Sequence, residues 1–297
     1  MYYNILMGMK KALLVLFCFI FFTLPCFAIK IGLQTQESRA FIGASTEAEI
    51  IDCNTNKLIF VMDKMKGYEF KPYKNMIAIK VNGDFKKIES NKIVIKAKNN
   101  GYVSAKKKWY RGYLRVVNDG FGLTVINDVP IEDYIQGVVP SEMPSSWNPE
   151  AHKAQAIAAR SYALANMGKR AKYGYDLKDT PEDQAYGGAS AETVKTNKAV
   201  QETKSIVIVY DKKIIPAYYS ASAGGQSKSA GEVWTKDLPY LTSRPSFDEG
   251  IKKNGHGVGM SQYGANNRAN EGYNAYQILR YFYPNTKFAK INEDYYK

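Results

Sequence analysis

One carboxylate in the sequence stands in a setting that suits acid–base chemistry. Glu142 lies in the run PSEMP, residues 140–144, whose two prolines predict a stiff loop. Apolar Met143 and Trp147 follow it closely. A carboxylic acid held near apolar groups has its ionised form destabilised, which is how proteins keep a general acid protonated. Glu142 is therefore the candidate catalytic acid.

A second stretch with chemical potential is GHGVGMSQ, residues 255–262. Its three alternate glycines allow unusual backbone angles and the close approach of another molecule. They also expose or aim His256, one of only two histidines in the chain. Ser261 can cap a helix that runs to about Asn270. The pattern favours a site role for His256, whereas His152, midway on a predicted amphipathic helix, fits a structural role.

Two helices are predicted to position Glu142. The first has Asp128 as its cap and Pro130 in its first turn, and Gly137 and Pro140 are expected to end it. The second has Asn148 as its cap with proline directly after it, and glycine 168 is expected to stop it. Small residues recur along one side of the second helix, which predicts very close packing against a neighbour.

The rest of the chain predicts an α+β fold, with a β-rich N-terminal part followed by a mixed α/β catalytic core around a long central helix. Short β-type runs recur at 29–33, 50–52, 57–62, 76–81 and 92–97. Runs 113–117 and 123–127 predict a hairpin leading into the first helix. A helix is expected at 191–203 and strands at 205–210 and 214–219. The predicted domains are a signal peptide at 1–28, a β-rich region at 29–112 and the core at 113–297.

The N-terminus predicts export. Lys10 and Lys11 precede an apolar run at 12–22, and residues 26–28, Cys-Phe-Ala, resemble a small-residue cleavage site. The run is shorter than the roughly 20 residues that a membrane span needs. We expect a cleaved signal and a location in the cell envelope, with an uncleaved anchor as the alternative and the sole membrane contact. Cys53 would then be alone in the mature chain, as a small buried hydrophobe.

The charge predicts a polyanionic partner. The formal net charge is +13, and removal of residues 1–28 would take away two lysines and leave +11. An exported protein meets peptidoglycan, teichoic acid and anionic lipid rather than chromosomal DNA, so we expect no nucleic-acid partner. The reading as an exported nucleic-acid binder depends on charge alone.

Four stretches resemble the SpoIID/LytB family of bacterial cell-wall proteins. They are residues 127–164, YYSASAGGQSKSAGEVWTKDLPYL at 218–241, GHGVGMSQYGA at 255–265 and YQILRYFYPNT at 276–286, and they lie in the family's order. The chain departs from many members in the short connection at 242–254, which predicts a compact cleft rim. It also lacks the Cys and His that resemble zinc ligands in some members. Its corresponding loop, 175–188, has Asp176, Asp179, Glu182 and Asp183 in place of Cys and His, so we expect no metal and no cofactor.

The resemblance implies a lytic transglycosylase that cleaves peptidoglycan glycan strands and forms 1,6-anhydro ends, with Glu142 as the acid. It also implies that cleft residues lie on the long helix, after the second late strand and in the glycine-rich stretch. These are Gln155, Arg160, Ser161, Tyr162, Ser220, Ser222, Gly224, Gly225, His256, Gly257, Gly259, Met260, Ser261 and Gln262. Arg160 could instead tie down a loop by pairing with an acid.

Two alternatives stay open at this point. A second carboxylate from Glu132, Asp133, Glu150 or Asp183 would make the reaction a hydrolysis. LytB-type members are described as modifiers that stimulate a cell-wall amidase. Under that hypothesis the protein is a non-catalytic wall-binding partner of an amidase, and Glu142 merely braces its loop.

Overall fold

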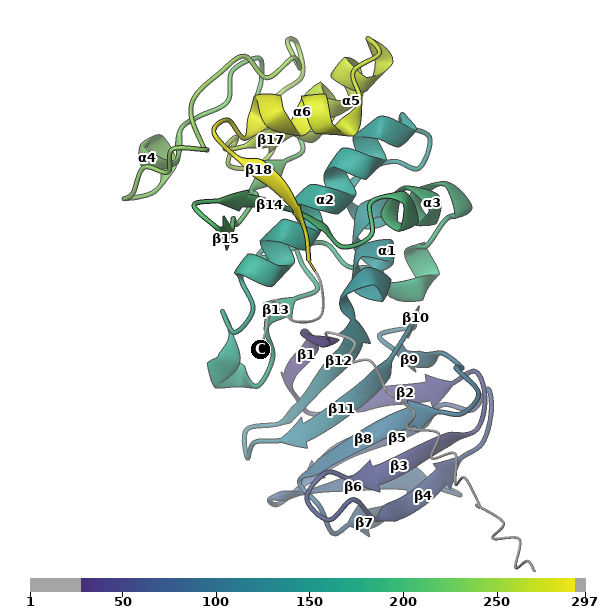
Figure 1. Cartoon of the computed structure of the whole chain (residues 1–297). Helices are drawn as coiled ribbons and strands as arrows, with labels where there is room; N and C mark the ends of the chain where they lie inside the picture. The colour runs from purple at the N-terminus through teal and green to yellow at the C-terminus, as the bar shows by residue number, and fades with distance from the viewer. Residues whose placement is uncertain (1–27, 292–297) are drawn as a thin grey trace, which may run out of the picture.

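The computed structural model describes residues 28–291, and its fold is α+β, as predicted. A β-rich part lies below and a helical part lies above it (Figure 1). The predicted signal peptide falls outside the described residues except for Ala28. Within residues 28–291, every helix is too short or too polar to cross a membrane.

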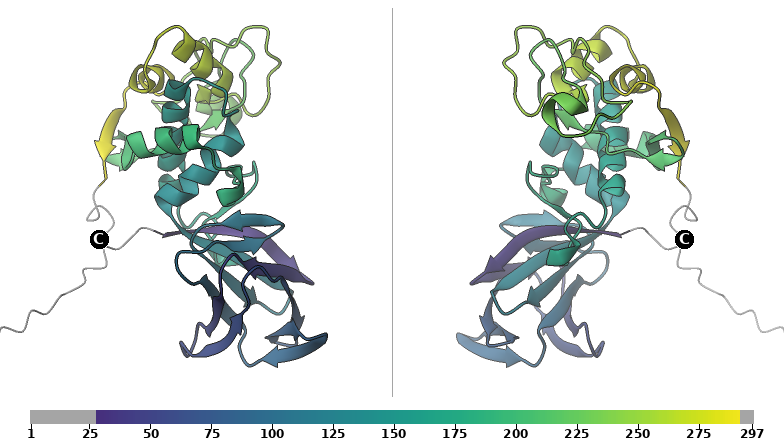
Figure 2. Two further views of the ribbon diagram at one scale, coloured as in Figure 1. Left: turned by 90° about the vertical axis from the view of Figure 1, so that its right-hand side faces the viewer. Right: turned by 90° about the vertical axis from the view of Figure 1, so that its left-hand side faces the viewer.

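The lower part contains two sheets that face each other beneath the helices (Figure 2). One has the order β13 (Leu177–Lys178), β1 (Ala28–Glu37), β12 (Leu123–Pro130), β11 (Tyr113–Asn118), β8 (Lys92–Ala97), β3 (Ala48–Asp52) and β4 (Leu58–Met62). The other has the order β10 (Lys108–Tyr110), β9 (Val103–Ala105), β2 (Ala40–Ala44), β5 (Tyr68–Tyr73), β6 (Met76–Val81) and β7 (Asp84–Ile88).

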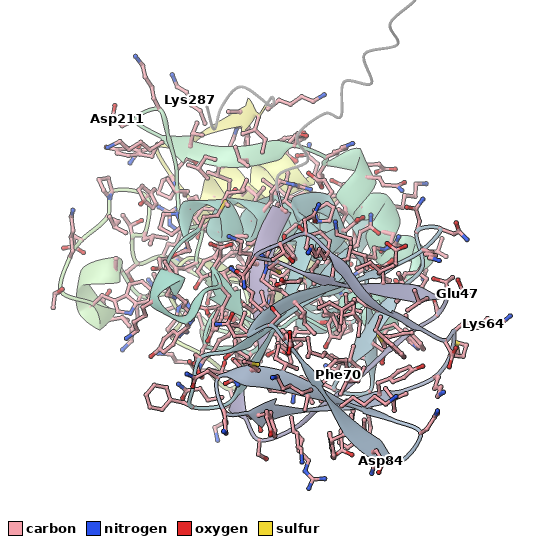
Figure 3. The ribbon with its side chains drawn as sticks, turned by 90° about the horizontal axis from the view of Figure 1, so that it is seen from below. Glu47, Lys64, Phe70, Asp84, Asp211 and Lys287 are labelled. Carbon is pink, nitrogen blue, oxygen red and sulfur yellow. The ribbon has the colours of Figure 1, made fainter. Side chains whose placement is uncertain are left out.

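The core of this lower part forms because its strands alternate apolar and polar residues. Ile42, Ile50, Phe70 and Ile95 are fully buried in it. Seen from below, Phe70 lies inside the sandwich, whereas the charged side chains of Glu47, Lys64 and Asp84 lie at its margin (Figure 3). Apolar burial of this kind is the main favourable contribution to folding.

The hairpin predicted before the first helix is confirmed, because β11 and β12 pair antiparallel from Tyr113–Asp128 to Asn118–Leu123. β11 also pairs with β8, so the larger sheet combines strands from both sides of residue 112. Among the strands of these two sheets, β2, β5, β7, β9, β10 and β13 were not predicted. β7, DFKKI, lies at a sheet edge, where charged residues are tolerated and the alternating signal is weak.

The upper part is built around α2 (Pro149–Ala165), which is buried along most of its length. Around it lie α1 (Ile131–Glu142), α3 (Val194–Glu202), α5 (Gln262–Asn270), α6 (Ala275–Phe282), the short α4 (Ala230–Val233) and the 3-10 turns Ala171–Tyr173 and Gly188–Ala191. A small sheet has the order β15 (Lys213–Ile214), β14 (Ile206–Tyr210), β18 (Lys287–Lys290), and β16 (Tyr219–Ser220) pairs parallel with β17 (Met260–Ser261). The predicted long central helix is α2.

The expected end of the first helix was wrong. α1 continues through Gly137 and Pro140 and ends at Glu142, so the candidate acid is a helical residue rather than a loop residue. Gly137 permits this because a Cβ there would lie 2.5 Å from the Tyr186 ring. Its carbonyl accepts hydrogen bonds from Ser141 Oγ at 2.8 Å and from the backbone N–H of residue 187 at 3.1 Å. These contacts brace the last turn of α1, in which Pro140 cannot donate the usual helix bond to the carbonyl of residue 136.

Other helix and strand limits also differ from prediction. Asp128 lies in β12 and pairs with Arg115 instead of capping α1. The predicted strand 214–219 is divided into β15 and β16, and α2 ends at Ala165, before the glycine expected to stop it. The caps at Asn148 and Ser261 are confirmed, because each side chain accepts a backbone N–H of its helix.

Candidate active site

Glu142 lies in a cavity of about 530 Å³ in the upper part of the molecule. The cavity is lined by the end of α1, by Tyr162 of α2, by the loop at 181–185, by β16 with its neighbours, by Trp234, by residues 254–256 and by Gln262 at the start of α5. Segments from most of the upper part therefore converge on one half-buried carboxylate.

Three donors hold the carboxylate of Glu142. Its Oε1 accepts from the backbone N–H of Ala185 at 2.8 Å and from the Tyr219 hydroxyl at 3.4 Å. Its Oε2 accepts from Nε2 of Gln262 at 3.1 Å. Both oxygens are fixed in direction, which is the preorganisation that a positioned acid needs.

A buried chain of side chains stands behind the Tyr219 hydroxyl. Gln184 donates from Nε2 to that hydroxyl at 2.8 Å and accepts the Tyr134 hydroxyl at 3.2 Å. Because the Tyr219 oxygen accepts from Gln184, its own proton is free to point at Glu142. Burial raises the pKa of Tyr219 well above its ordinary value, so the hydroxyl stays a donor.

Burial raises the pKa of Glu142 above its ordinary value. The hydrogen bonds from Ala185, Gln262 and Tyr219 act in the opposite direction and only partly offset it. The sequence interpretation attributes this effect to Met143 and Trp147. Neither residue lines the cavity: Met143 is in the core around α2, and Trp147 packs against Tyr263 with ring centroids 4.9 Å apart.

The other acids of the cavity have cationic partners. Asp183 accepts from Lys169 at 2.7 Å and from Arg170 at 2.5 Å, and its pKa is lowered because these bonds outweigh its burial. Glu182 pairs with Lys178 at 2.9 Å. Among the described acids that line the cavity, Glu142 alone lacks a cationic partner, which makes it the one best suited to carry a proton.

The remaining candidates for a second carboxylate lie outside the cavity, and two of them are held by cations. Glu132 accepts from Arg160 in a bidentate pair, and Glu150 pairs with Lys153 at 2.7 Å. Burial raises the pKa of Asp133, which lies in the first turn of α1 at the opposite end from Glu142.

Five of the predicted site residues line the cavity together: Glu142, Tyr162, Ser220, His256 and Gln262. The others do not line it: Gln155, Arg160, Ser161, Ser222, Gly224, Gly225, Gly257, Gly259, Met260 and Ser261. Several of these support the walls. Ser161, for example, accepts from the backbone N–H of Ile208, and Gly259 lets the backbone approach Tyr218, whose carbonyl oxygen a Cβ would meet at 2.0 Å.

Arg160 is fully buried and ties three elements together. It holds Glu132 of α1 with two bonds of 2.9 and 2.7 Å and donates to the carbonyl of Ile206 at 3.0 Å. This geometry matches the alternative in which Arg160 pairs with an acid to tie down a neighbouring segment. His152 likewise contacts the carbonyl of Pro144 at 3.0 Å and secures the turn after Glu142.

A buried aspartate fixes the small-residue loop that follows β16. Asp248 accepts from the backbone N–H groups of Ala223 and Gly225 at 2.6 and 2.7 Å. It also accepts from the hydroxyls of Ser246 and Ser261. Since Ser261 precedes Gln262, a donor to Glu142, Asp248 links two walls of the cavity.

Sequence reasoning missed Gln184, Tyr219, Trp234 and Asp248. Gln184 sits in an acidic loop without any pattern of its own, and Asp248 lies in the connection that was treated as a shortened rim. Trp234 and Tyr219 fall inside a stretch that carried the family resemblance, but only the small residues there were singled out.

Comparison with known proteins finds similarity over part of the chain. Residues 119–210 match the family model described as "Stage II sporulation protein", SpoIID. An uncharacterized protein of Brachyspira hyodysenteriae is 34% identical over 198 residues, which cover 66% of this chain and 49% of that protein.

Two Bacillus subtilis proteins are also similar. The amidase enhancer is 44% identical over 110 residues, 37% of this chain and 15% of that protein. Stage II sporulation protein D is 26% identical over 262 residues, 56% of this chain and 76% of that protein. The chain thus spans about half of the first relative and a small part of the amidase enhancer.

Proposed function

From the premise that the chain carries a SpoIID-family domain in residues 119–210, we propose that it is an exported peptidoglycan lytic transglycosylase. It acts in the cell envelope on the bond between MurNAc and GlcNAc of the glycan strand, and it leaves 1,6-anhydro-MurNAc ends. Glu142 is its catalytic acid and base.

The observation that carries the proposal is the isolation of Glu142. The cavity offers one carboxylate with a raised pKa, and the neighbouring Asp183 and Glu182 are held by cations. A glycosidase of the usual kind needs two carboxylates, one as acid and one as base or nucleophile. A transglycosylase needs one, because the substrate supplies the nucleophile.

The reaction balances without water. Glu142 donates its proton to the oxygen that links MurNAc C1 to the GlcNAc, and that C1–O bond breaks through an oxocarbenium-like state. The 6-hydroxyl of the same MurNAc then bonds to C1, and its proton passes to the Glu142 carboxylate. The donors Ala185, Gln262 and Tyr219 stabilise the carboxylate between the two transfers. The enzyme ends the cycle as it began.

The second candidate function is enhancement of an amidase without catalysis. It is favoured by the 44% identity to a protein named amidase enhancer, over 110 residues. Under this function the protein binds peptidoglycan and a cell-wall amidase, and Glu142 braces the cavity. The buried chain from Tyr134 through Gln184 to Tyr219 argues for the enzyme, because a mere brace needs no orientation of a proton.

The test is a digestion of purified glycan strands with the mature protein, followed by mass spectrometry of the ends. Anhydro-MurNAc ends support the transglycosylase, and reducing MurNAc ends would indicate hydrolysis. A parallel assay adds a cell-wall amidase to intact peptidoglycan. Stimulated amidase activity without any strand cleavage would replace the first proposal by the second.

A further inference from the structure

Trp234 presents an aromatic ring to the cavity that holds Glu142, and the acid–base chemistry of Glu142 does not use it. It is half-buried and lines the cavity together with Ser220 and Asn254. Trp234 follows the four-residue helix α4 directly and is its C-cap. A short helix carrying a large side chain toward a polar cavity needs an explanation, because burial elsewhere would stabilise the ring more.

The segment around Trp234 is fixed at several points. Ser229 and Glu232 form a reciprocal capping box at the start of α4, with bonds of 3.3 and 2.6 Å. Asp237 accepts the backbone N–H of Gly231 at 2.7 Å, and the N–H of Trp234 itself donates to the carbonyl of Ala230 at 2.7 Å. The ring is therefore held by a rigid support.

Two rings from the cavity lining pack against the indole. The ring centroid of Tyr218 lies 4.5 Å from that of Trp234, and the ring centroid of His256 lies 5.3 Å from that of Trp234. His256 Nδ1 accepts the backbone N–H of Val258 at 3.0 Å, which fixes the orientation of the imidazole ring. His256 therefore serves as a positioning residue for Trp234.

An unpaired hydroxyl lies in the same wall. Ser220 is more than nine-tenths buried, and its Oγ has no hydrogen-bond partner among residues 28–291. The backbone of Gly255 lies directly against it, since a Cβ there would approach the Ser220 Cβ to 2.7 Å. A buried hydroxyl without a partner is costly unless a ligand completes it.

We propose that Trp234, Ser220 and Asn254 form a subsite for one N-acetylhexosamine ring, whose C–H face stacks on the indole while the two polar side chains bind its hydroxyl or acetamido groups. The negative face of an aromatic ring attracts the polarised C–H groups of a pyranose. An apolar surface with a few placed polar groups is the usual design of a ligand site. The subsite depends on the proposed function only for the identity of the longer polymer.

The test measures binding separately from cleavage. The parent protein is Glu142→Gln with Trp109→Phe and Trp147→Phe, so that Trp234 is the sole tryptophan of the mature chain. It is titrated with the β-1,4-linked tetramer of N-acetylglucosamine while its tryptophan emission is followed. We expect a saturable change in emission and a measurable Kd.

Substitutions in the parent protein then test whether the Trp234 ring and the Ser220 hydroxyl provide the affinity. Variants that lack tryptophan are titrated by calorimetry. Trp234→Leu, which keeps an apolar side chain, should raise the Kd at least tenfold, equal to about 1.4 kcal/mol. Trp234→Phe, which keeps an aromatic ring on Tyr218 and His256, should raise it less than Trp234→Leu does. Ser220→Ala should weaken binding with little change in melting temperature. The matched control is Trp109→Phe, on β10, added to the Glu142→Gln single variant, and it should leave the Kd of that variant unchanged.

The outcomes separate the subsite from the proposed function. The subsite proposal is overturned if the parent protein shows no change in tryptophan emission and no measurable binding of the tetramer. It is also overturned if a folded Trp234→Leu protein binds the tetramer with an unchanged Kd. Either result holds even if the wild type cleaves strands. If the tetramer binds through Trp234 but the wild type never cleaves strands, the subsite stands and the transglycosylase proposal fails. If Trp234→Leu fails to fold, the Kd values of Trp234→Phe and Ser220→Ala for the tetramer decide whether the subsite exists.

Discussion

Replacement of Asp248 by asparagine should destabilise the protein strongly although the shape of the side chain is kept. Asp248 is fully buried and accepts four hydrogen bonds, two on each carboxylate oxygen. Burial alone would raise its pKa, but the bonds from Ser246, Ser261, Ala223 and Gly225 outweigh burial and lower it. The ionised carboxylate is therefore the form that the folded protein needs.

The magnitude follows from counting the donors at each oxygen. In the Asp248→Asn protein, the new amide NH₂ would face one backbone N–H and one serine hydroxyl. The hydroxyl can turn, but the N–H is left unpaired, at a cost of about 1–3 kcal/mol. The remaining bonds lose their charge assistance, which adds roughly 1 kcal/mol. We expect a total loss of about 2–4 kcal/mol and a fall in melting temperature of roughly 5–15 °C.

Urea unfolding followed by circular dichroism measures the loss, with the exposed Asp84 as a matched control. Asp84→Asn should change the free energy of unfolding by no more than about 0.5 kcal/mol. Because the folded pKa of Asp248 is lowered, its contribution is complete above the unfolded pKa of about 3.9 and is lost as the pH falls through the folded pKa. The gap between wild type and Asp248→Asn should thus narrow below about pH 4. A gap at pH 7 below about 1 kcal/mol, the lower end of the cost of one unpaired buried donor, would refute the reasoning.

Three further predictions concern the cavity and its supports. Tyr219→Phe removes a donor that stabilises the Glu142 carboxylate, so the pKa of Glu142 should rise and the high-pH limb of the activity profile should move upward in pH; a downward move would contradict this role. Arg160→Ala removes the cationic partner of Glu132 and a donor to the carbonyl of Ile206, so unfolding in urea should show a loss of about 3 kcal/mol or more in the free energy of unfolding. Normal stability together with lost activity would instead indicate that Arg160 acts in the candidate active site rather than as a structural support. Elemental analysis of the dialysed protein should find no stoichiometric zinc, and a unit ratio would show that the acidic loop was misjudged.

Local signals in the sequence were enough to predict the caps of α2 and α5 and the hairpin before α1. Asn148 and Ser261 cap their helices because a cap depends on neighbours within three residues. β11 and β12 likewise pair across a short turn. Such features need no knowledge of the remote chain.

Features that depend on remote contacts escaped prediction. Gly137 and Pro140 predicted the end of α1, but contacts with Tyr186 and its neighbours keep the helix intact. Gln184 reaches the site only because the acidic loop folds back over α1. Asp248 acts through four donors spread over the late loops, and no local pattern announces them.

The most direct test of the central claim is the rate at which Glu142→Gln forms anhydro-MurNAc ends from purified glycan strands. The substitution keeps the shape and removes the transferable proton, so the rate should fall by about 10²–10⁴-fold or more while strand binding survives. Glu182→Gln, at the cavity rim and paired with Lys178, is the matched control and should retain most of the activity. Near-normal formation of anhydro ends by Glu142→Gln would contradict the assignment of Glu142 as the catalytic acid.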